Sequence, residues 1–208
     1  MALTKVRGGG VDNPLTLGGG SASDNSIVFD GNAQDFHIGL DDSTDSLTMG
    51  LGSSLGTTSH IVTDSSGRVE KPLQPYFLAK PSSSSAGDGN TANPFKFQNV
   101  IHNVGNHFVT SGTGAHERFV APITARYIFC TAPGYLQSST NFNFRLRVNG
   151  SNYVELGRFI QGSAASHCLF TGSIIIQLSA NDYVDIINNY TPYHINATYN
   201  FFCGYLLG

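Results

Sequence analysis

The chain has 208 residues, a net charge of −3 and 12% charged residues. Glycine, tyrosine and phenylalanine are frequent, tryptophan is absent, and no segment shows the spacing of an amphipathic helix. This composition favours an all-β fold in which strands are joined by tight turns. The sequence has no cluster of Lys and Arg that could neutralise a phosphate backbone and no run of ~20 apolar residues, so we expect no nucleic-acid binding and no membrane insertion.

The first part of the chain carries short apolar segments separated by glycine turns. Residues 36–40 and 47–51 share the pattern apolar, any, apolar, Gly, Leu, which indicates a weak repeat of short strands. Strands this short offer too few inward side chains to offset the entropy of ordering without a partner. We therefore predict that residues 1–72 form an N-terminal attachment and shaft module, an intertwined β shaft or collar shared with other copies.

A β-hairpin is predicted downstream of this module. Residues 141–148 alternate between apolar and polar side chains, which places one face in a core and the other in water. Asn149 and Gly150 follow directly, and this pair tolerates the positive φ angles of a type I′ turn. Residues 153–156 then return as the partner strand.

Two later segments, residues 174–178 and 199–207, are apolar on both faces. A strand of this kind is covered once by its own core and once by something else, and a subunit interface is the expected cover. The residues that we expect at this interface are Ile175, Phe201, Tyr205 and Leu207.

Four short motifs follow one another in this second part. They are Phe-Val-Ala-Pro at 119–122, Arg-Tyr-Ile-Phe at 126–129, Leu-Ser-Ala-Asn-Asp-Tyr-Val at 178–184 and Phe-Cys-Gly-Tyr-Leu-Leu at 202–207. In this order they resemble the globular head of complement component one-q and its tumour-necrosis-factor relatives, over residues of about 75–208. The resemblance implies that residues 73–208 form a homotrimeric jelly-roll head domain that binds or builds rather than catalyses. Ala125 and Asn181 replace glycines usual in the family, but asparagine also accepts a left-handed turn.

The N-terminal module carries a second resemblance. Residues 26–43, together with 47–51 and the opening 1–6, look like segments of fibre and other structural proteins from marine bacteriophages, notably those of cyanobacteria. The resemblance implies a virion protein that is assembled in the host cytoplasm and attached to another virion protein through this module. We expect a tail fibre or spike that contacts a glycan or protein of the host surface. The alternatives are a capsid decoration or head-fibre protein and a spike-associated glycan depolymerase.

Receptor contacts are expected on loops of the head, because loops on a rigid scaffold commonly carry binding residues. Tyrosine and histidine offer the aromatic and polar mix that suits the faces of sugars. The candidate contact residues are Tyr135, Tyr190, Tyr193 and His194.

No catalytic residue, cofactor or metal site is predicted. The sequence has no HExxH and no Cys-x-x-Cys motif, its serines lie in low-complexity or Gly-rich stretches, and we interpret Cys130, Cys168 and Cys203 as buried thiols. The acidic run at 41–45 is interpreted as a solvated turn, with a calcium site as the alternative. An inward histidine from each of three copies would also form a metal site that no single-chain motif reveals.

Overall fold

The computed structural model describes residues 16–82, 94–110, 117–132, 134–135, 142–159, 168–169, 171–188 and 198–208. In these ranges the regular structure is β, apart from the short 3-10 helix η1 (Val104–Asn106). No helix among these residues is long and apolar enough to cross a membrane. The chain divides into two compact units, Met1–Leu73 and Gln74–Gly208.

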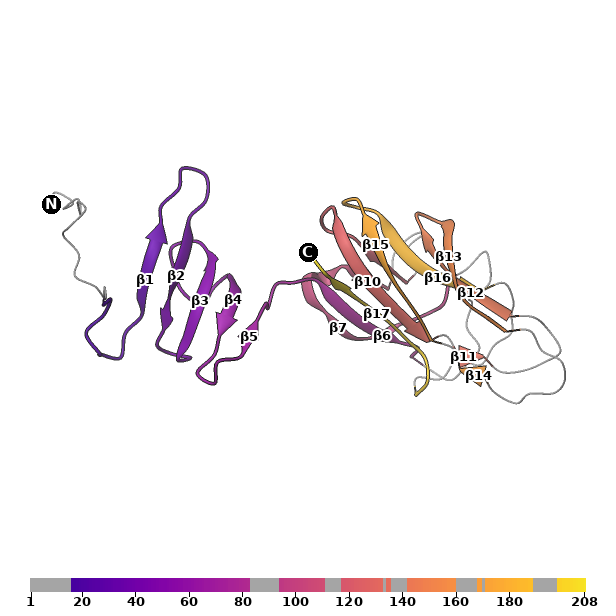
Figure 1. Ribbon diagram of the computed structural model, residues 1–208, viewed down its shortest axis with the longest axis horizontal. Helices are drawn as coiled ribbons and strands as arrows, with labels where there is room; N and C mark the ends of the chain where they lie inside the picture. The colour runs from indigo at the N-terminus through magenta and orange to yellow at the C-terminus, as the bar shows by residue number, and fades with distance from the viewer. Residues whose placement is uncertain are drawn as a thin grey trace. The chain divides into compact units, whose positions relative to one another are not determined.

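The first unit contains one antiparallel sheet in which each strand pairs with the next along the chain (Figure 1). Its strands are β1 (Asn25–Phe29), β2 (Phe36–Asp41), β3 (Ser46–Leu51), β4 (Ser59–Thr63) and β5 (Val69–Glu70). The two repeat segments form β2 and β3, which pair with Ile38 opposite Met49. The short-strand architecture predicted for this region is therefore confirmed, and its intertwining with other copies stays a prediction.

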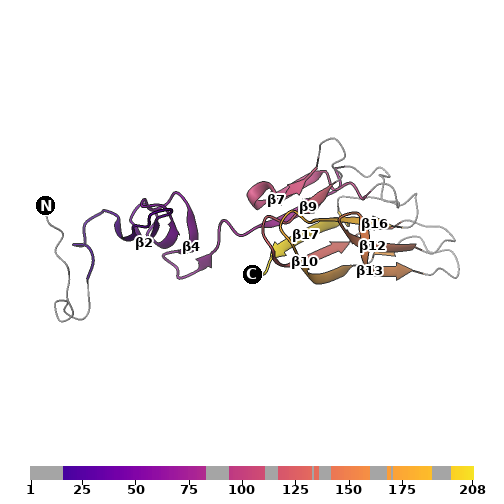
Figure 2. The same cartoon turned by 90° about the horizontal axis from the view of Figure 1, so that it is seen from above.

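The second unit contains two five-stranded antiparallel sheets and a small two-stranded one (Figures 1 and 2). The first sheet has the order β15-β10-β17-β6-β7, from Gly172–Leu178, Ala125–Ala132, Phe201–Leu206, Tyr76–Lys80 and Asn99–Asn103. The second has the order β13-β12-β16-β9-β8, from Ser151–Phe159, Phe142–Val148, Tyr183–Asn188, Arg118–Val120 and Phe108–Val109. Strands β11 (Gly134–Tyr135) and β14 (Cys168–Leu169) form the small sheet. The predicted all-β jelly-roll sandwich is confirmed.

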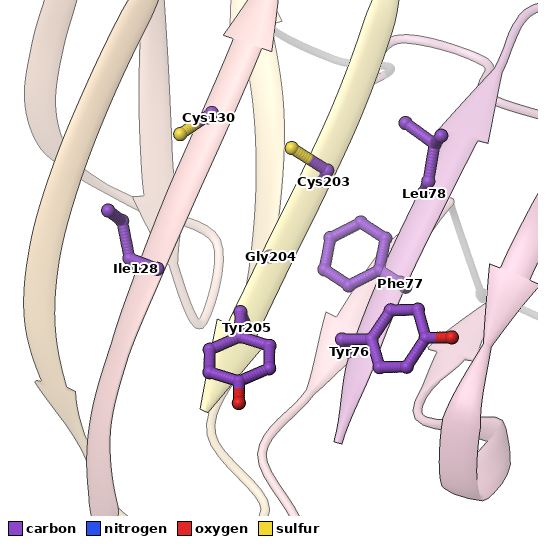
Figure 3. Close-up of a pocket in the computed structure, with 8 residues that line it drawn as sticks. All are labelled: Tyr76, Phe77, Leu78, Ile128, Cys130, Cys203, Gly204 and Tyr205. Atoms are coloured by element: carbon purple, nitrogen blue, oxygen red, sulfur yellow. The ribbon is translucent and has the colours of Figure 1, made fainter. Parts of the chain in front are cut away.

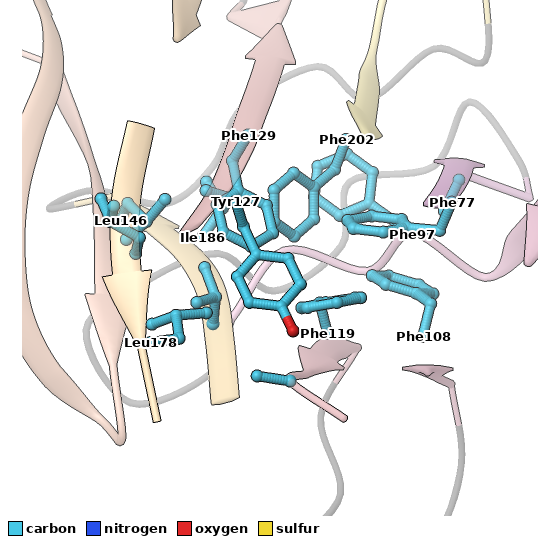
Figure 4. Packing of buried hydrophobic residues seen from close by; sticks show 14 of the residues in the cluster. Phe77, Phe97, Phe108, Phe119, Tyr127, Phe129, Leu146, Leu178, Ile186 and Phe202 are labelled. Carbon is cyan, nitrogen blue, oxygen red and sulfur yellow. The ribbon is translucent and has the colours of Figure 1, made fainter. Parts of the chain in front are cut away.

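An aromatic cluster from both large sheets fills the sandwich (Figure 4). Phe77 of β6 stacks on Phe108 of β8 with ring centroids 4.6 Å apart and meets Phe202 of β17 edge to face at 4.9 Å. Phe119 of β9 meets Phe129 of β10 at 5.4 Å. These rings are nearly inaccessible to water, so the cluster buries a large apolar area between the two sheets.

The hairpin predicted around Asn149 and Gly150 is present as β12 and β13. Both turn residues have positive φ angles, 51° and 76°, as a type I′ turn requires. Phe144 and Leu146 point into the core as expected. The opposite face differs from the prediction, because Arg147 is mostly buried against Asp185 of β16, to which it donates two hydrogen bonds of 2.7 Å. Arg147 thus contacts an acidic residue of the neighbouring strand instead of solvent. The alternation within one strand does not reveal such a partner.

Gly204 sits in β17 directly between Phe129 of β10 and Phe77 of β6. A Cβ at this position would lie 2.6 Å from atoms of each ring, and the rings are held by the rest of the cluster. We expect Gly204→Ala to destabilise the domain by about 1–3 kcal/mol through overpacking, as a lower urea midpoint. Gly19→Ala is the control, because a Cβ added at Gly19 would have no atom within 4 Å apart from those of its chain neighbours. An unchanged midpoint for Gly204→Ala would show that the rings move aside freely.

Candidate subunit interface

The first sheet of the sandwich packs one face against the core. Its other face points outward, and this outer face is apolar. Ile175, Ile128, Tyr205 and Tyr76 are cross-strand neighbours on β15, β10, β17 and β6, so they form a row across four strands. Side chains alternate along a strand, which places this row opposite the core side. Three of the four are well exposed in the single chain, led by Ile175 at 58%.

An open hollow of about 390 Å³ lies over the middle of this face (Figure 3). Strands β6, β10 and β17 supply its lining, and no charged side chain takes part. The lining residues are Tyr76, Phe77, Leu78, Ile128, Cys130, Cys203, Gly204 and Tyr205. An uncharged hollow on a sheet face is shaped to accept apolar side chains of another protein surface rather than an ion.

The residues predicted at a subunit interface all belong to this sheet or its end. Ile175 and Tyr205 lie in the apolar row, Leu207 follows β17 and is 46% exposed, and Phe201 opens β17 half-buried. Sequence reasoning missed Tyr76 and the other lining residues of β6 and β10. Their signal was present, because alternation places Tyr76 on the side opposite the buried Phe77.

The described structure does not test the predicted receptor-contact residues. Tyr135 lies in β11, where only the backbone course is described. Tyr190, Tyr193 and His194 lie outside the described residues. Their role stays a prediction.

Cys130 and Cys203 face each other across β10 and β17 on the outward side of the sheet. Both are free and half-buried, whereas the sequence suggested thiols inside a core. The difference arises because Phe129 and Phe202, their neighbours along the strands, occupy the core positions. Burial, reinforced by the adjacent Cys130, raises the pKa of the Cys203 thiol to about 11.

We expect Cys203 to resist alkylation at pH 9. An unperturbed thiol with a pKa of ~8.5 is mostly thiolate at that pH, whereas a thiol with a raised pKa remains protonated, and only the thiolate reacts. Iodoacetamide labelling followed by peptide mass spectrometry checks this, with the urea-unfolded chain as the control. Equal labelling rates of the Cys203 peptide in the folded and unfolded chains would contradict the assignment.

Three further polar residues of the second unit, His102, His107 and Asp182, have structural surroundings. Burial lowers the pKa of His107, and His102 packs its ring 5.9 Å from that of Tyr76. Asp182 accepts hydrogen bonds from the Asn149 side chain and the Ser179 backbone, and these bonds lower its pKa. Contacts of this kind stabilise a turn and fix the orientation of a ring. Among the described residues, no three metal-ligating side chains lie close enough together to hold an ion.

The acidic run at 41–45 forms the turn between β2 and β3. One carboxylate oxygen of Asp41 accepts hydrogen bonds from the Ser43 backbone at 3.1 Å and the Ser43 hydroxyl at 2.6 Å. Asp45 adopts a positive φ of 51° to close the turn. The run is thus a turn, as interpreted, but Asp41 is only 8% exposed, so its carboxylate serves the turn and is not solvated as expected.

Two facing antiparallel five-stranded sheets, one of them with an apolar outer face, define a jelly-roll domain suited to association through that face. The sequence comparison agrees, since residues 77–207 match the family model described as the C1q domain. The chain therefore belongs to the C1q domain family. Domains of the C1q and tumour-necrosis-factor type typically form homotrimers and are typically non-enzymatic binding or structural domains.

Solved structures with a similar fold include the globular domain of zebrafish complement 1qA protein. It is 17% identical, aligns over 65% of this chain and 98% of its own, and gives a TM-score of 0.51. Murine APRIL aligns over 64% of this chain and 99% of its own at 10% identity, with a TM-score of 0.48. Eiger TNF from S. frugiperda aligns over 65% of this chain and 94% of its own at 13% identity, with a TM-score of 0.46. A search of curated proteins finds no match. At these identities the structural likeness establishes the fold alone.

Proposed function

We propose that this protein is a non-enzymatic, homotrimeric bacteriophage virion protein, a tail fibre or spike adhesin that contacts the host cell surface. The observation that carries the proposal is the apolar outer face of the first jelly-roll sheet. Ile175, Tyr205 and Leu207 leave about half of their side-chain surface in water there. Burying a fully exposed side chain of this size stabilises by about 1.5–3 kcal/mol, and each of these residues has about half of that burial still to gain, so association through this face is favoured.

Three copies are the proposed number because domains of this family typically assemble as homotrimers. A homotrimer presents three identical sets of loops at one end. Weak single contacts with a repeated host-surface glycan or protein then combine into strong binding, which is the usual advantage of an adhesin with several identical sites. The proposed contact residues are Tyr135, Tyr190, Tyr193 and His194.

The assignment to a virion is supported by the sequence of the first unit, whose residues 26–43 resemble structural proteins of marine phages. In this proposal the protein folds in the host cytoplasm and joins the particle there. The first unit binds another virion protein, and the jelly roll projects from it.

Immunogold labelling of phage particles with antibody against the purified protein tests the location. Label confined to the tail, together with slower phage adsorption when free protein is added, is the expected result. Label spread over the head would instead establish the capsid decoration or head-fibre alternative. Release of reducing sugar from host envelope glycan by the purified protein would overturn the non-enzymatic assignment in favour of a depolymerase.

The anchoring role of the first unit has its own test. A chain that lacks residues 1–72 is expected to be missing from assembled particles while the full chain is incorporated. Incorporation of the shortened chain at the normal level would show that the jelly-roll domain carries the attachment.

A further inference from the structure

The sheet of the first unit has one face that is almost entirely apolar. Strand pairing aligns its side chains in rows, such as Ile27, Ile38, Met49 and Ile61 on β1 to β4. The other members of this face, called here the apolar face, are Asn25, Phe29, Phe36, Leu40, Leu47, Leu51, Thr63 and Val69. None of these twelve side chains is charged.

The opposite face of the same sheet is polar, yet it is the buried one. His37, Thr48 and Ser46 are 2–4% exposed. The connection between β3 and β4 lies over them: His37 Nδ1 donates to the Gly52 carbonyl at 3.0 Å, and a Cβ at Gly50 would meet the Thr58 carbonyl oxygen. A Cβ at Gly56 would similarly approach the Asp41 carboxylate. The chain's own loop thus occupies the polar side.

The sheet is therefore oriented with its apolar side outward, the reverse of the usual arrangement for a sheet with one covered face. Phe29 is 60% exposed, and the rings and aliphatic chains beside it are 42–49% exposed. A fully exposed large side chain has an accessible surface of about 200 Å². The six exposed apolar residues of this face on β1 to β3 therefore leave roughly 600 Å² of apolar surface in water. This is close to the ~800 Å² that each partner buries in a standard interface.

We infer that the apolar face packs against the same face of two other copies, so that three sheets enclose a dry apolar interior. The inference rests on the proposed function, because it takes the number of copies from the proposed homotrimer. The face is free of charge, and identical uncharged faces meet without electrostatic repulsion.

The link between the two units favours copies of the chain over any other occupant. Strand β5 ends at Glu70 and β6 begins at Tyr76, so five residues connect the sheet to the jelly roll. When three jelly rolls associate, such short links hold the three sheets at effective concentrations of about millimolar or above. At that effective concentration, an interface with roughly 600 Å² of apolar surface per chain needs only a weak intrinsic affinity to form.

Photo-crosslinking of the full chain tests the inference. The photoreactive amino acid benzoylphenylalanine is placed at Met49, which is 44% exposed on the apolar face, or at Val28, which is 39% exposed on the opposite face of β1. After irradiation of purified protein, denaturing gels are expected to show crosslinked dimers and trimers several-fold more abundant for the Met49 variant. Leu40, 45% exposed on the same apolar face, is the second labelling position should the first variant fail to fold.

Light scattering on the same samples distinguishes failure of this inference from failure of the proposed homotrimer. A trimeric protein with no inter-chain product from Met49 or Leu40, or with products confined to one chain, overturns this inference and leaves the proposed homotrimer standing. A monomeric protein overturns both. A mass above that of a trimer overturns the inference, because it shows that the face joins separate assemblies rather than closing within one.

Discussion

Tyr205→Glu is expected to convert the homotrimer into monomers that remain folded. Tyr205 lies between Ile128 and Tyr76 in the apolar row, beside a hollow whose lining has no charge. Association of the variant would place three carboxylates in apolar surroundings without a cationic partner, and desolvation costs several kcal/mol for each such ion. The side chain is 41% exposed in the single chain, so the monomer itself tolerates the substitution.

Light scattering is the measurement, with circular dichroism to confirm that the β structure persists. Tyr153→Glu is the matched control, because Tyr153 is also an exposed tyrosine, at 57%, but lies on β13 of the other sheet. The control is expected to stay trimeric. A trimeric Tyr205→Glu variant would mean that association uses another surface of the domain.

Asp185→Ala is expected to destabilise the jelly roll by about 3–5 kcal/mol, the usual cost of leaving one partner of a buried ion pair alone. The Asp185 side chain is 2% exposed and that of Arg147 is 12% exposed, and two parallel hydrogen bonds of 2.7 Å join them. The hydrogen bond to Asp185 raises the pKa of Arg147 in the wild-type domain. Arginine is protonated at neutral pH even without such a partner, so the guanidinium stays charged after Asp185 is removed. Urea unfolding monitored by circular dichroism gives the free energy.

A double variant separates charge from packing. Asp185→Leu combined with Arg147→Met removes both charges together, and we expect it to recover most of the lost stability. Arg158→Gln breaks the solvent-exposed pair with Glu155 and is expected to leave the midpoint unchanged. If Asp185→Ala and Arg158→Gln had equal effects, burial of the Arg147 pair would have no energetic importance.

The parts of the fold that the sequence predicted are those that depend on local pattern. Strict alternation and an Asn-Gly pair specify the β12–β13 hairpin, and the structure has it with both turn residues at positive φ. Asn181 likewise takes a positive φ of 72°, as expected for an asparagine in place of glycine. Exposed Ile175 beside buried Ile176 shows why a strand apolar on both faces indicates an interface.

The features that the sequence did not predict depend on which strands become neighbours. Arg147 is buried because β16 places Asp185 beside it, and the two residues are far apart in the chain. Cys130 and Cys203 face each other for the same reason. In the first unit the alternation of β2 and β3 is visible in the sequence, but the burial of the polar side, at His37 and Thr48, follows from the path of the β3–β4 connection.

The proposed homotrimer is tested by the molar mass of the purified full chain in solution, measured by light scattering over a range of concentrations. For a homotrimer we expect a mass three times the 22.2 kDa of one chain, constant on dilution. A mass of one chain at every concentration would contradict it, because the apolar row of Ile175, Ile128, Tyr205 and Tyr76 would then remain in water with no partner.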